Sequence, residues 1–314
     1  MEVRAVRVVF AGSGEFSLPS LRALAASGHP LTLVITAPDR SGSRGRPAPR
    51  PVRDLAHELG LPVEQPARLS ADWAGAAPLV SADLLVVCAY GQLIPASVLQ
   101  LFPQGALGVH PSLLPCHRGA SPIAAAILAG DSETGVSIYR MDERLDAGPL
   151  LAQERVPILG DATNMELERA LAEVGARLLV AALAGLDRGE AVLSTQDEGR
   201  ATYSHKVSRR DGELDWSLPA REIDRKLRAL SPWPGVSVLL AGIRVKLLAG
   251  TAEPLPEGVA AAPGTVIGSD ADSILVGTGL GAYRVSLVQP PGGRPMPPPA
   301  FLRGRRAPVR ERAR

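Results

Sequence analysis

Up to about residue 190, short apolar runs alternate with helical patterns, and this alternation restricts the fold more than any other feature. Apolar, often β-branched runs predict buried strands at 6–11, 31–36, 84–88, 106–109, 135–139 and 155–158. Apolar residues three or four positions apart predict helices at 17–27, 51–59 and 163–186. Strands that alternate with helices predict an α/β domain with a largely parallel sheet covered on both faces.

The pattern changes after this point. Residues 190–208 lack helical periodicity and are interpreted as a linker, and residues 219–230 form one amphipathic helix. Short apolar runs broken by Gly, Pro and Asp then follow from Val236 to Val288, which is typical of a small antiparallel β-barrel. We therefore predict a domain over 1–189, a linker over 190–208 and a second domain over 209–314.

Composition excludes several classes of protein. No run of 18 apolar residues exists, which excludes a membrane-spanning helix, and the N-terminus shows no signal peptide, so we expect a cytoplasmic protein. Cys88 and Cys116 are too few for a disulfide framework or a four-cysteine zinc site. His110 and His117 are seven residues apart without a third ligand, so no metal is expected.

Charge is distributed unevenly along the 314 residues. Residues 1–199 carry 16 basic and 22 acidic side chains, whereas residues 200–314 carry 18 basic and 10 acidic ones. A second basic segment, Pro38–Arg53, is rich in Gly and Pro and contains Arg40, Arg44 and Arg46, as expected of a surface loop that contacts phosphates. A polyanionic partner such as a nucleic acid fits both features, and a general arginine bias of the chain fits them as well.

Two polar segments interrupt the apolar background. Gly12-Ser13-Gly14 follows the first strand but lacks the third glycine of a dinucleotide-binding loop, so a tight turn is the better interpretation. His110 directly follows a short strand, where open α/β sheets bind ligands, and an acidic loop at 141–148 follows the next strand. A histidine and a carboxylate from these loops would form an acid–base pair. A structural histidine and a solvated acidic loop fit the same spacing.

Several motifs carry a resemblance to a known family. His110-Pro111-Ser112-Leu113-Leu114-Pro115, followed by Arg118-Gly119, resembles the 10-formyltetrahydrofolate-dependent formyltransferase superfamily, and Leu145-Asp146-Ala147-Gly148 is similar to a second motif of it. The branch of that superfamily that acts on tRNA is also similar in five further segments. They are Phe10-Ala11-Gly12, Pro38-Asp39-Arg40 with Arg44-Gly45-Arg46, Ala89-Tyr90-Gly91, Asp215-Trp216 and Pro232-Trp233-Pro234.

The resemblance implies a Rossmann-like catalytic domain and a C-terminal barrel similar to an oligonucleotide-binding fold. It implies transfer of a formyl group from 10-formyltetrahydrofolate to the α-amine of initiator methionyl-tRNA. We expect a monomer, since no exposed coiled-coil or long edge-strand pattern argues against one, and the reaction needs no metal. By this resemblance His110 and Asp146 are catalytic. The folate co-substrate would contact Ser112, Leu113, Leu114, Pro115, Ala89, Tyr90, Gly91 and Asp142. The tRNA would contact Arg40, Arg44, Arg46, Lys206, Arg209 and Arg210.

One position departs from the family pattern. The superfamily has Asn two residues before the histidine, where this chain has Gly108. That amide is expected to donate to the developing oxyanion, and loss of one such donor lowers a rate by about 10²- to 10³-fold. A water or backbone N–H could replace it, the chain could be a weakened form, or it could bind without turnover. A formyltransferase for a small amine, or a hydrolase of the folate, would use the same N-terminal fold.

Overall fold

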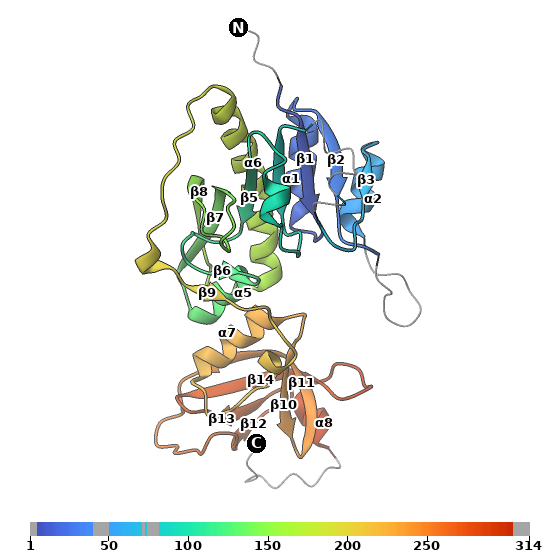
Figure 1. Ribbon diagram of the computed structural model, residues 1–314. Helices are drawn as coiled ribbons and strands as arrows, with labels where there is room; N and C mark the ends of the chain where they lie inside the picture. Colours follow the sequence, from blue (N-terminus) through green and yellow to red (C-terminus); the bar gives the residue numbers. More distant parts are fainter. Residues whose placement is uncertain (1–4, 40–49, 71–72, 74–81, 304–314) are drawn as a thin grey trace. The chain divides into compact units, whose positions relative to one another are not determined.

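The computed structural model describes residues 5–39, 50–70, 73 and 82–303, and it divides into two compact units (Figure 1). The first unit takes in most of the chain up to His205. The second contains the chain from Lys206 onward, together with Ala124–Asp131 and Leu159–Met165. The sequence-based division had assigned both of these short segments to the N-terminal domain.

A seven-stranded sheet forms the centre of the first unit. Its order is β3-β2-β1-β4-β5-β7-β8. The first five strands are parallel to one another, β7 is antiparallel to β5, and β8 is antiparallel to β7. The predicted, mostly parallel sheet is therefore confirmed. The strands are β1 (Val8–Gly12), β2 (Leu31–Ile35), β3 (Val63–Glu64), β4 (Leu84–Cys88), β5 (Ala106–His110), β7 (Glu133–Arg140) and β8 (Leu150–Pro157). β8 begins at Leu150, before the predicted 155. Partly exposed and exposed residues alternate along most of this edge strand, so it lacks the continuous apolar run that marks a buried strand.

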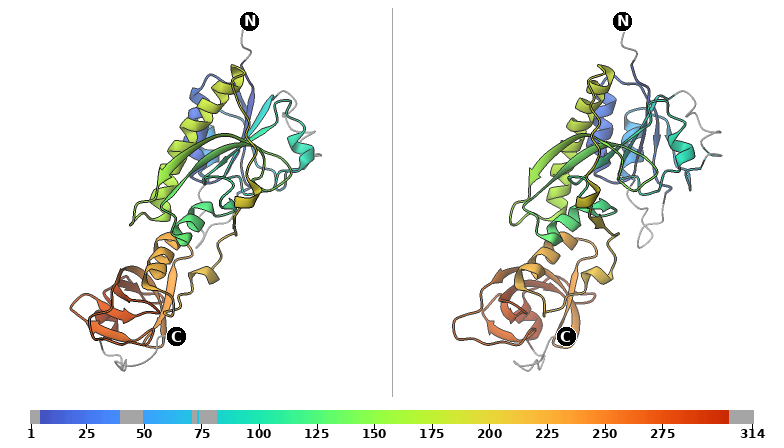
Figure 2. Two further views of the ribbon diagram at one scale, coloured as in Figure 1. Left: turned by 90° about the vertical axis from the view of Figure 1, so that its left-hand side faces the viewer. Right: turned by 60° about the vertical axis from the view of Figure 1, so that its left-hand side comes forward.

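Helices cover both faces of this sheet, as predicted. On one face, Sγ of Cys88 in β4 lies 3.9 Å from Oγ of Ser20 in α1 (Ser17–Ala26). Gly175 of α6 (Asn164–Asp187) packs on that face too, so closely that a Cβ there would lie 3.1 Å from Val109. α1 and α6 run side by side (Figure 2), and α2 (Pro51–Glu58) packs against α1.

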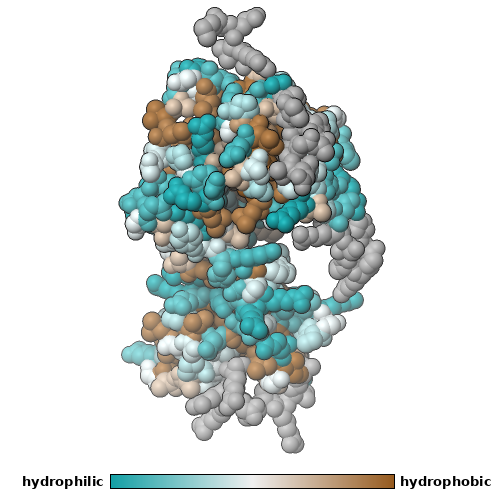
Figure 3. Space-filling view, viewed as in Figure 1, coloured by the Kyte–Doolittle hydropathy of each residue, from teal (hydrophilic) through white to brown (hydrophobic). Residues whose placement is uncertain are grey.

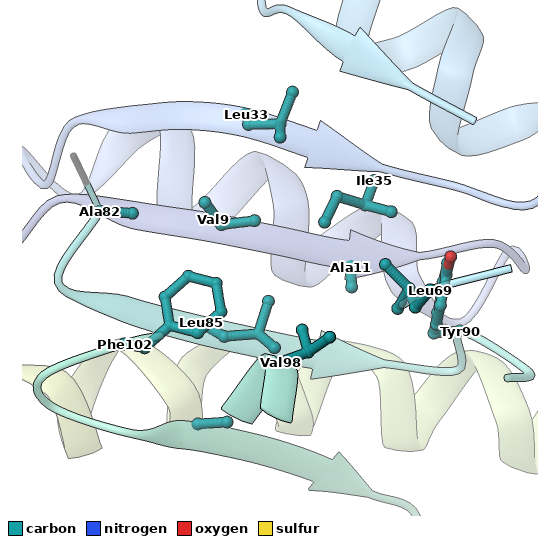
Figure 4. Close-up of a cluster of buried hydrophobic side chains, with 11 residues drawn as sticks. Val9, Ala11, Leu33, Ile35, Leu69, Ala82, Leu85, Tyr90, Val98 and Phe102 are labelled. Carbon is teal, nitrogen blue, oxygen red and sulfur yellow. The ribbon is translucent and has the colours of Figure 1, made fainter. Parts of the chain in front are cut away.

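The opposite face carries an apolar cluster beneath α4 (Ala96–Leu99). There Val98 and the neighbouring Phe102 pack on Val9 and Leu85 from the central strands (Figure 4). All four side chains are at most 3% exposed. The core thus lies on both faces of the sheet around β1 and β4. The loops that follow these strands lie at the edge formed by the carboxyl ends of the strands.

The second unit is built on an antiparallel sheet of five strands in the order β10-β11-β14-β13-β12, which confirms a separate C-terminal β domain. α7 (Ala220–Leu230) is amphipathic and packs on the sheet with its apolar face. Bulges within β11 interrupt its register with β14. The remaining bounds are β10 (Val236–Leu240), β11 (Ile243–Glu253), β12 (Val266–Ser269), β13 (Ile274–Gly277), β14 (Ala282–Gln289) and α8 (Pro298–Leu302). The sequence patterns missed α5 (Pro122–Ala129), because this helix is apolar all round and so has no periodicity.

Much of the segment interpreted as a linker is built into the first unit. Ser194 bridges to Leu150, and β9 (Tyr203–Ser204) pairs with β6 (Arg118–Gly119). Gln196 and Ser204 are buried, at 4% and 8% exposure. An extended segment that makes such single contacts leaves no periodic signal, and for this reason its sequence resembles that of a linker.

Polar and apolar residues are interspersed over the face of the molecule shown in Figure 3. Within the described residues, no helix combines the length and the apolar character that crossing a bilayer requires.

Candidate active site

The candidate site is built at the carboxyl end of β5. Cys88 of β4 and Val109 of β5 are register partners in adjacent parallel strands, so the segments that follow them leave the sheet at the same edge. His110 is the last residue of β5 and is only 7% exposed. The position expected for a ligand-binding histidine from the sequence is therefore the position it has in the structure.

Asp146 lies opposite this histidine. Its Oδ2 is 3.7 Å from Nδ1 of His110, and the two side chains are 13% and 8% exposed. Oδ2 also accepts a hydrogen bond of 2.7 Å from the backbone N–H of Gly119. The structure thus brings together the imidazole and the carboxylate that the sequence had suggested as an acid–base pair.

The hydrogen bond of the His110 ring determines the tautomer of its neutral form. Nε2 lies 3.0 Å from the carbonyl oxygen of His117, and a carbonyl only accepts, so the proton of the neutral ring sits on Nε2. Nδ1 then carries the lone pair and faces Asp146. Burial lowers the pKa of His110, whereas the charge of Asp146 and the bond to His117 oppose this shift.

The backbone of the loop that carries Asp146 is fixed by close packing and by hydrogen bonds. Asp146 has a φ of +49°, and at Gly148 the chain passes so close to the carbonyl of Arg140 that a Cβ has no room. Gln196 donates from Nε2 to the carbonyl oxygens of Asp146 at 2.9 Å and Gly148 at 2.7 Å. These contacts fix the backbone of the loop on both sides of its short turn.

A buried arginine completes this support. Arg118 is 1% exposed, and its guanidinium donates to Oε1 of Gln196 at 2.8 Å and to Glu198 at 2.8 Å. Sequence reasoning missed Gln196, because it lies in the segment interpreted as a linker and no motif or periodicity marks it.

Gly108 lies in the middle of β5, and its register partner is Tyr139 of β7. The phenol of Tyr139 fills the space beside Gly108 and donates to Oδ1 of Asp146 at 2.7 Å. Burial, and next the charge of Asp146, raise the pKa of Tyr139 well above its ordinary value, so the hydroxyl stays protonated. No sequence pattern marks this residue, because the pairing of β7 with β5 is visible only in the structure.

The loop after His110 is fixed by buried hydrogen bonds. Oγ of Ser137 accepts from the N–H of Leu114 at 3.0 Å and donates to the carbonyl of Ser112 at 2.6 Å. Gln153 donates from Nε2 to Oγ of Ser137 and to the carbonyl of Leu114, each at 2.8 Å. Ser112 and Leu114 are buried by this network, and Leu113 and Pro115 are partly exposed.

A hollow of about 530 Å³ opens beside the segment that follows β4. Its walls combine apolar and polar side chains: Arg68, Leu69, Gln92, Leu93, Ile94, Pro95, Ala96 and Glu143. The residues predicted to bind folate in this region adjoin the hollow in sequence. Ala89 and Gly91 are exposed in the segment that follows β4, Tyr90 is buried in the apolar cluster, and Asp142 pairs with Arg144 at 2.9 Å.

Of the predicted tRNA contacts, Lys206, Arg209 and Arg210 are exposed at the start of the second unit. Arg40, Arg44 and Arg46 lie outside the described residues. Among the residues that the structure describes, no group of three or more His, Cys, Asp or Glu side chains is placed to hold a metal ion.

The sequence is similar to known formyltransferases over nearly its whole length. Residues 6–183 match the family described as "Formyl transferase", and residues 206–306 match "Formyl transferase, C-terminal domain". A methionyl-tRNA formyltransferase from Heliobacterium modesticaldum is 40% identical over 308 residues, which cover 96% of this chain and 98% of that protein. One from Granulibacter bethesdensis is 44% identical over 305 residues, or 96% and 95% of the two chains.

Solved structures share the fold at lower identity. An N-formyltransferase from Helicobacter canadensis, in complex with folinic acid and dTDP-3-aminofucose, aligns with a TM-score of 0.68 and 15% identity, over 91% of this chain and 99% of that one. HypX from Aquifex aeolicus in complex with tetrahydrofolic acid aligns with a TM-score of 0.61 and 21% identity, over 94% of this chain. The alignment covers 46% of the HypX chain, so this chain spans about half of HypX.

Proposed function

Because the chain belongs to the formyl transferase family through both of its parts, we propose that it transfers a formyl group from 10-formyltetrahydrofolate to the α-amine of initiator methionyl-tRNA. The observation that carries this proposal is the similarity of nearly the whole chain, at 40% to 44% identity, to proteins named methionyl-tRNA formyltransferase. The apposition of His110 and Asp146 supplies groups suited to the chemistry.

In the proposed reaction, the methionyl amine forms a bond to the formyl carbon and the bond from that carbon to the folate nitrogen breaks. One proton must leave the amine, and one must reach the folate nitrogen. We propose that neutral His110 accepts the first proton on Nδ1 and returns it to the leaving nitrogen. General acid–base catalysis of this kind contributes about 10²- to 10⁴-fold to a rate.

Asp146 would stabilise the imidazolium that exists between these two proton transfers. Its carboxylate faces Nδ1, where the positive charge forms, and the site is buried, so the attraction is only weakly screened by solvent. The hydrogen bonds from Gly119 and Tyr139 keep the carboxylate in place as the charge on the ring changes.

We propose that the folate co-substrate lies in the hollow beside Gln92 and Ile94, against the segment from Ala89 to Ala96. The residues present fit a flat ring system with polar edges. Leu69, Ile94 and Pro95 offer apolar walls, and Gln92 and Glu143 offer an amide and a carboxylate that can bind ring nitrogens. Ser112, Leu113, Leu114, Pro115 and Asp142 remain predicted contacts.

The tRNA would be held by basic residues at the start of the second unit, Lys206, Arg209 and Arg210, and by Arg40, Arg44 and Arg46 of the basic loop. Since charged initiator tRNA is the acceptor, we propose a cytoplasmic location. We also expect the chain to act as a monomer, which sedimentation equilibrium tests directly.

A second candidate is formyl transfer to a small amine, because an N-formyltransferase solved with an amino sugar nucleotide shares this fold. The excess of 18 basic over 10 acidic side chains in residues 200–314 favours the larger, polyanionic acceptor.

The test is a formyl-transfer assay with 10-formyltetrahydrofolate and either methionyl initiator tRNA or methionine amide. We expect formylmethionine to form rapidly on the tRNA, and its formation at subsaturating tRNA to decline as salt is raised. The His110→Ala variant should lose transfer and keep its affinity for tRNA. Turnover of the small amine at the same rate, without dependence on salt, would overturn the proposal in favour of the second candidate.

A further inference from the structure

Tyr139 occupies the place where a side chain at position 108 would begin. Gly108 and Tyr139 are partners across the antiparallel β5–β7 pair, so their side-chain positions point to the same face of the sheet. A Cβ added to Gly108 would lie 2.5 Å from Cζ and 2.8 Å from Oη of Tyr139, and closer still to Cε1. Any residue other than glycine therefore requires the ring to move.

The ring is not free to move without a loss at the site. Tyr139 is 4% exposed, and its hydroxyl donates to Oδ1 of Asp146 at 2.7 Å. The other oxygen of the same carboxylate accepts from Gly119 and faces Nδ1 of His110 at 3.7 Å. Displacing the phenol would leave Oδ1 without this donor and release one of the two bonds that orient the carboxylate.

We propose that Tyr139 is a positioning residue for formyl transfer, which takes the place left by the family Asn and holds Asp146 against His110, and that position 108 is glycine to admit its ring. This inference rests on the proposed function for the reaction that it serves. The phenol has a single proton, which goes to Asp146, so it acts through the carboxylate and does not reproduce an amide donor to the oxyanion.

This pairing gives a structural reason for glycine at position 108. Restoring Asn at position 108 alone is expected to lower activity, because its Cβ would drive Tyr139 away from Asp146. A protein that only binds its substrates for want of the Asn would instead gain activity from the same change.

The decisive variant is Tyr139→Phe, which keeps the ring and removes the hydroxyl. We expect kcat to fall roughly 10- to 100-fold, since misplacement of a reacting group by about 1 Å costs on that order, while the KM for tRNA and for folate stays unchanged. Tyr283→Phe is the matched control. Tyr283 is also buried, and its hydroxyl has no hydrogen-bond partner among the described residues, so this change should leave kcat as it is.

A double-mutant cycle tests the pairing of the two positions. Gly108→Asn should lower both kcat and the unfolding temperature. Combining it with Tyr139→Leu, which removes the outer ring atoms, should restore much of the unfolding temperature, whereas kcat should stay low because the hydroxyl that binds Asp146 is gone. Effects of the two changes that simply add would overturn the pairing.

The pH titration of the His110 imidazole, followed by NMR, provides a readout that needs no substrate. Its midpoint should move in Tyr139→Phe and stay unchanged in Tyr283→Phe, because only the first change releases the carboxylate that faces the ring. If the unaltered protein fails to formylate methionyl-tRNA, the proposed function falls and this titration still decides the role of Tyr139. A Tyr139→Phe variant with an unchanged midpoint and an unchanged kcat would overturn the proposal.

Discussion

The side-chain amide of Gln196 donates to the backbone carbonyl of Asp146, a residue 50 positions earlier in the chain, at 2.9 Å. The same nitrogen also donates to the carbonyl of Gly148 at 2.7 Å. A residue remote in sequence thus sets the backbone of the loop that presents the carboxylate to His110.

Replacing Gln196 by Leu should therefore disturb the site without touching either candidate catalytic group. We expect a loss of about 1–3 kcal/mol in the free energy of unfolding, because buried carbonyls lose their donors and Arg118 loses an acceptor. A fall in kcat of about 10-fold or more should accompany it. Urea unfolding and steady-state kinetics check both, with Gln104→Leu at an exposed position as control. A stable variant with unaltered kcat would refute this role.

Ser137 should be equally important for the loop after His110. In Ser137→Ala the buried N–H of Leu114 loses its acceptor and the carbonyl of Ser112 loses its donor, at a cost of about 1–3 kcal/mol. We expect a lower unfolding temperature and a higher KM for 10-formyltetrahydrofolate. Calorimetry and folate titrations measure these quantities. Ser97→Ala, on an exposed face of α4, should change neither, and an equal effect there would point to a general cause.

Stability should depend on pH through His110. Burial lowers the pKa of His110 below its value in the unfolded chain, about 6.5, so between these two values the unfolded state binds more protons. The free energy of unfolding should then fall as the pH drops below about 6.5, and level off below the pKa of the folded state.

In the His110→Gln variant this contribution should be absent. Urea unfolding of both proteins, between about pH 5 and about pH 7.5, gives the difference directly. Parallel curves for the two proteins would show that His110 titrates alike in the folded and unfolded chains.

The basic residues at the start of the second unit should govern binding of tRNA and not of folate. Reversing Lys206 and Arg209 to Glu should weaken tRNA binding. The plot of the logarithm of the tRNA binding constant against the logarithm of salt concentration should become less steep. Its slope should decrease in magnitude by about 0.7–0.9 for each phosphate that the protein no longer neutralises. Filter binding at several salt concentrations measures both effects. Arg22→Glu combined with Arg177→Glu, exposed reversals on α1 and α6, is the control with the same change in net charge, and an equal loss there would mean that only net charge matters.

Most of the local structure could be predicted from the amino-acid sequence alone. Continuous apolar runs identified β1, β2, β4 and β5, since strands buried on both faces contain few polar residues, and helical spacing identified α1, α6 and α7. His110 was selected because it ends one of these strands, and Asp146 because it lies in an acidic loop with a family motif. These features depend only on residues that are close together in the sequence, so one amino-acid sequence is enough to predict them.

Which distant groups meet could be seen only in the folded chain. Tyr139 lies opposite Gly108 because β7 pairs with β5 in an antiparallel arrangement. No local sequence pattern specifies the register of this pair. Gln196 reaches the Asp146 loop from a segment without periodicity. Periodicity reports only whether a side chain is buried, whereas its partner depends on how the whole chain packs. For this reason the support of the carboxylate became visible only in three dimensions.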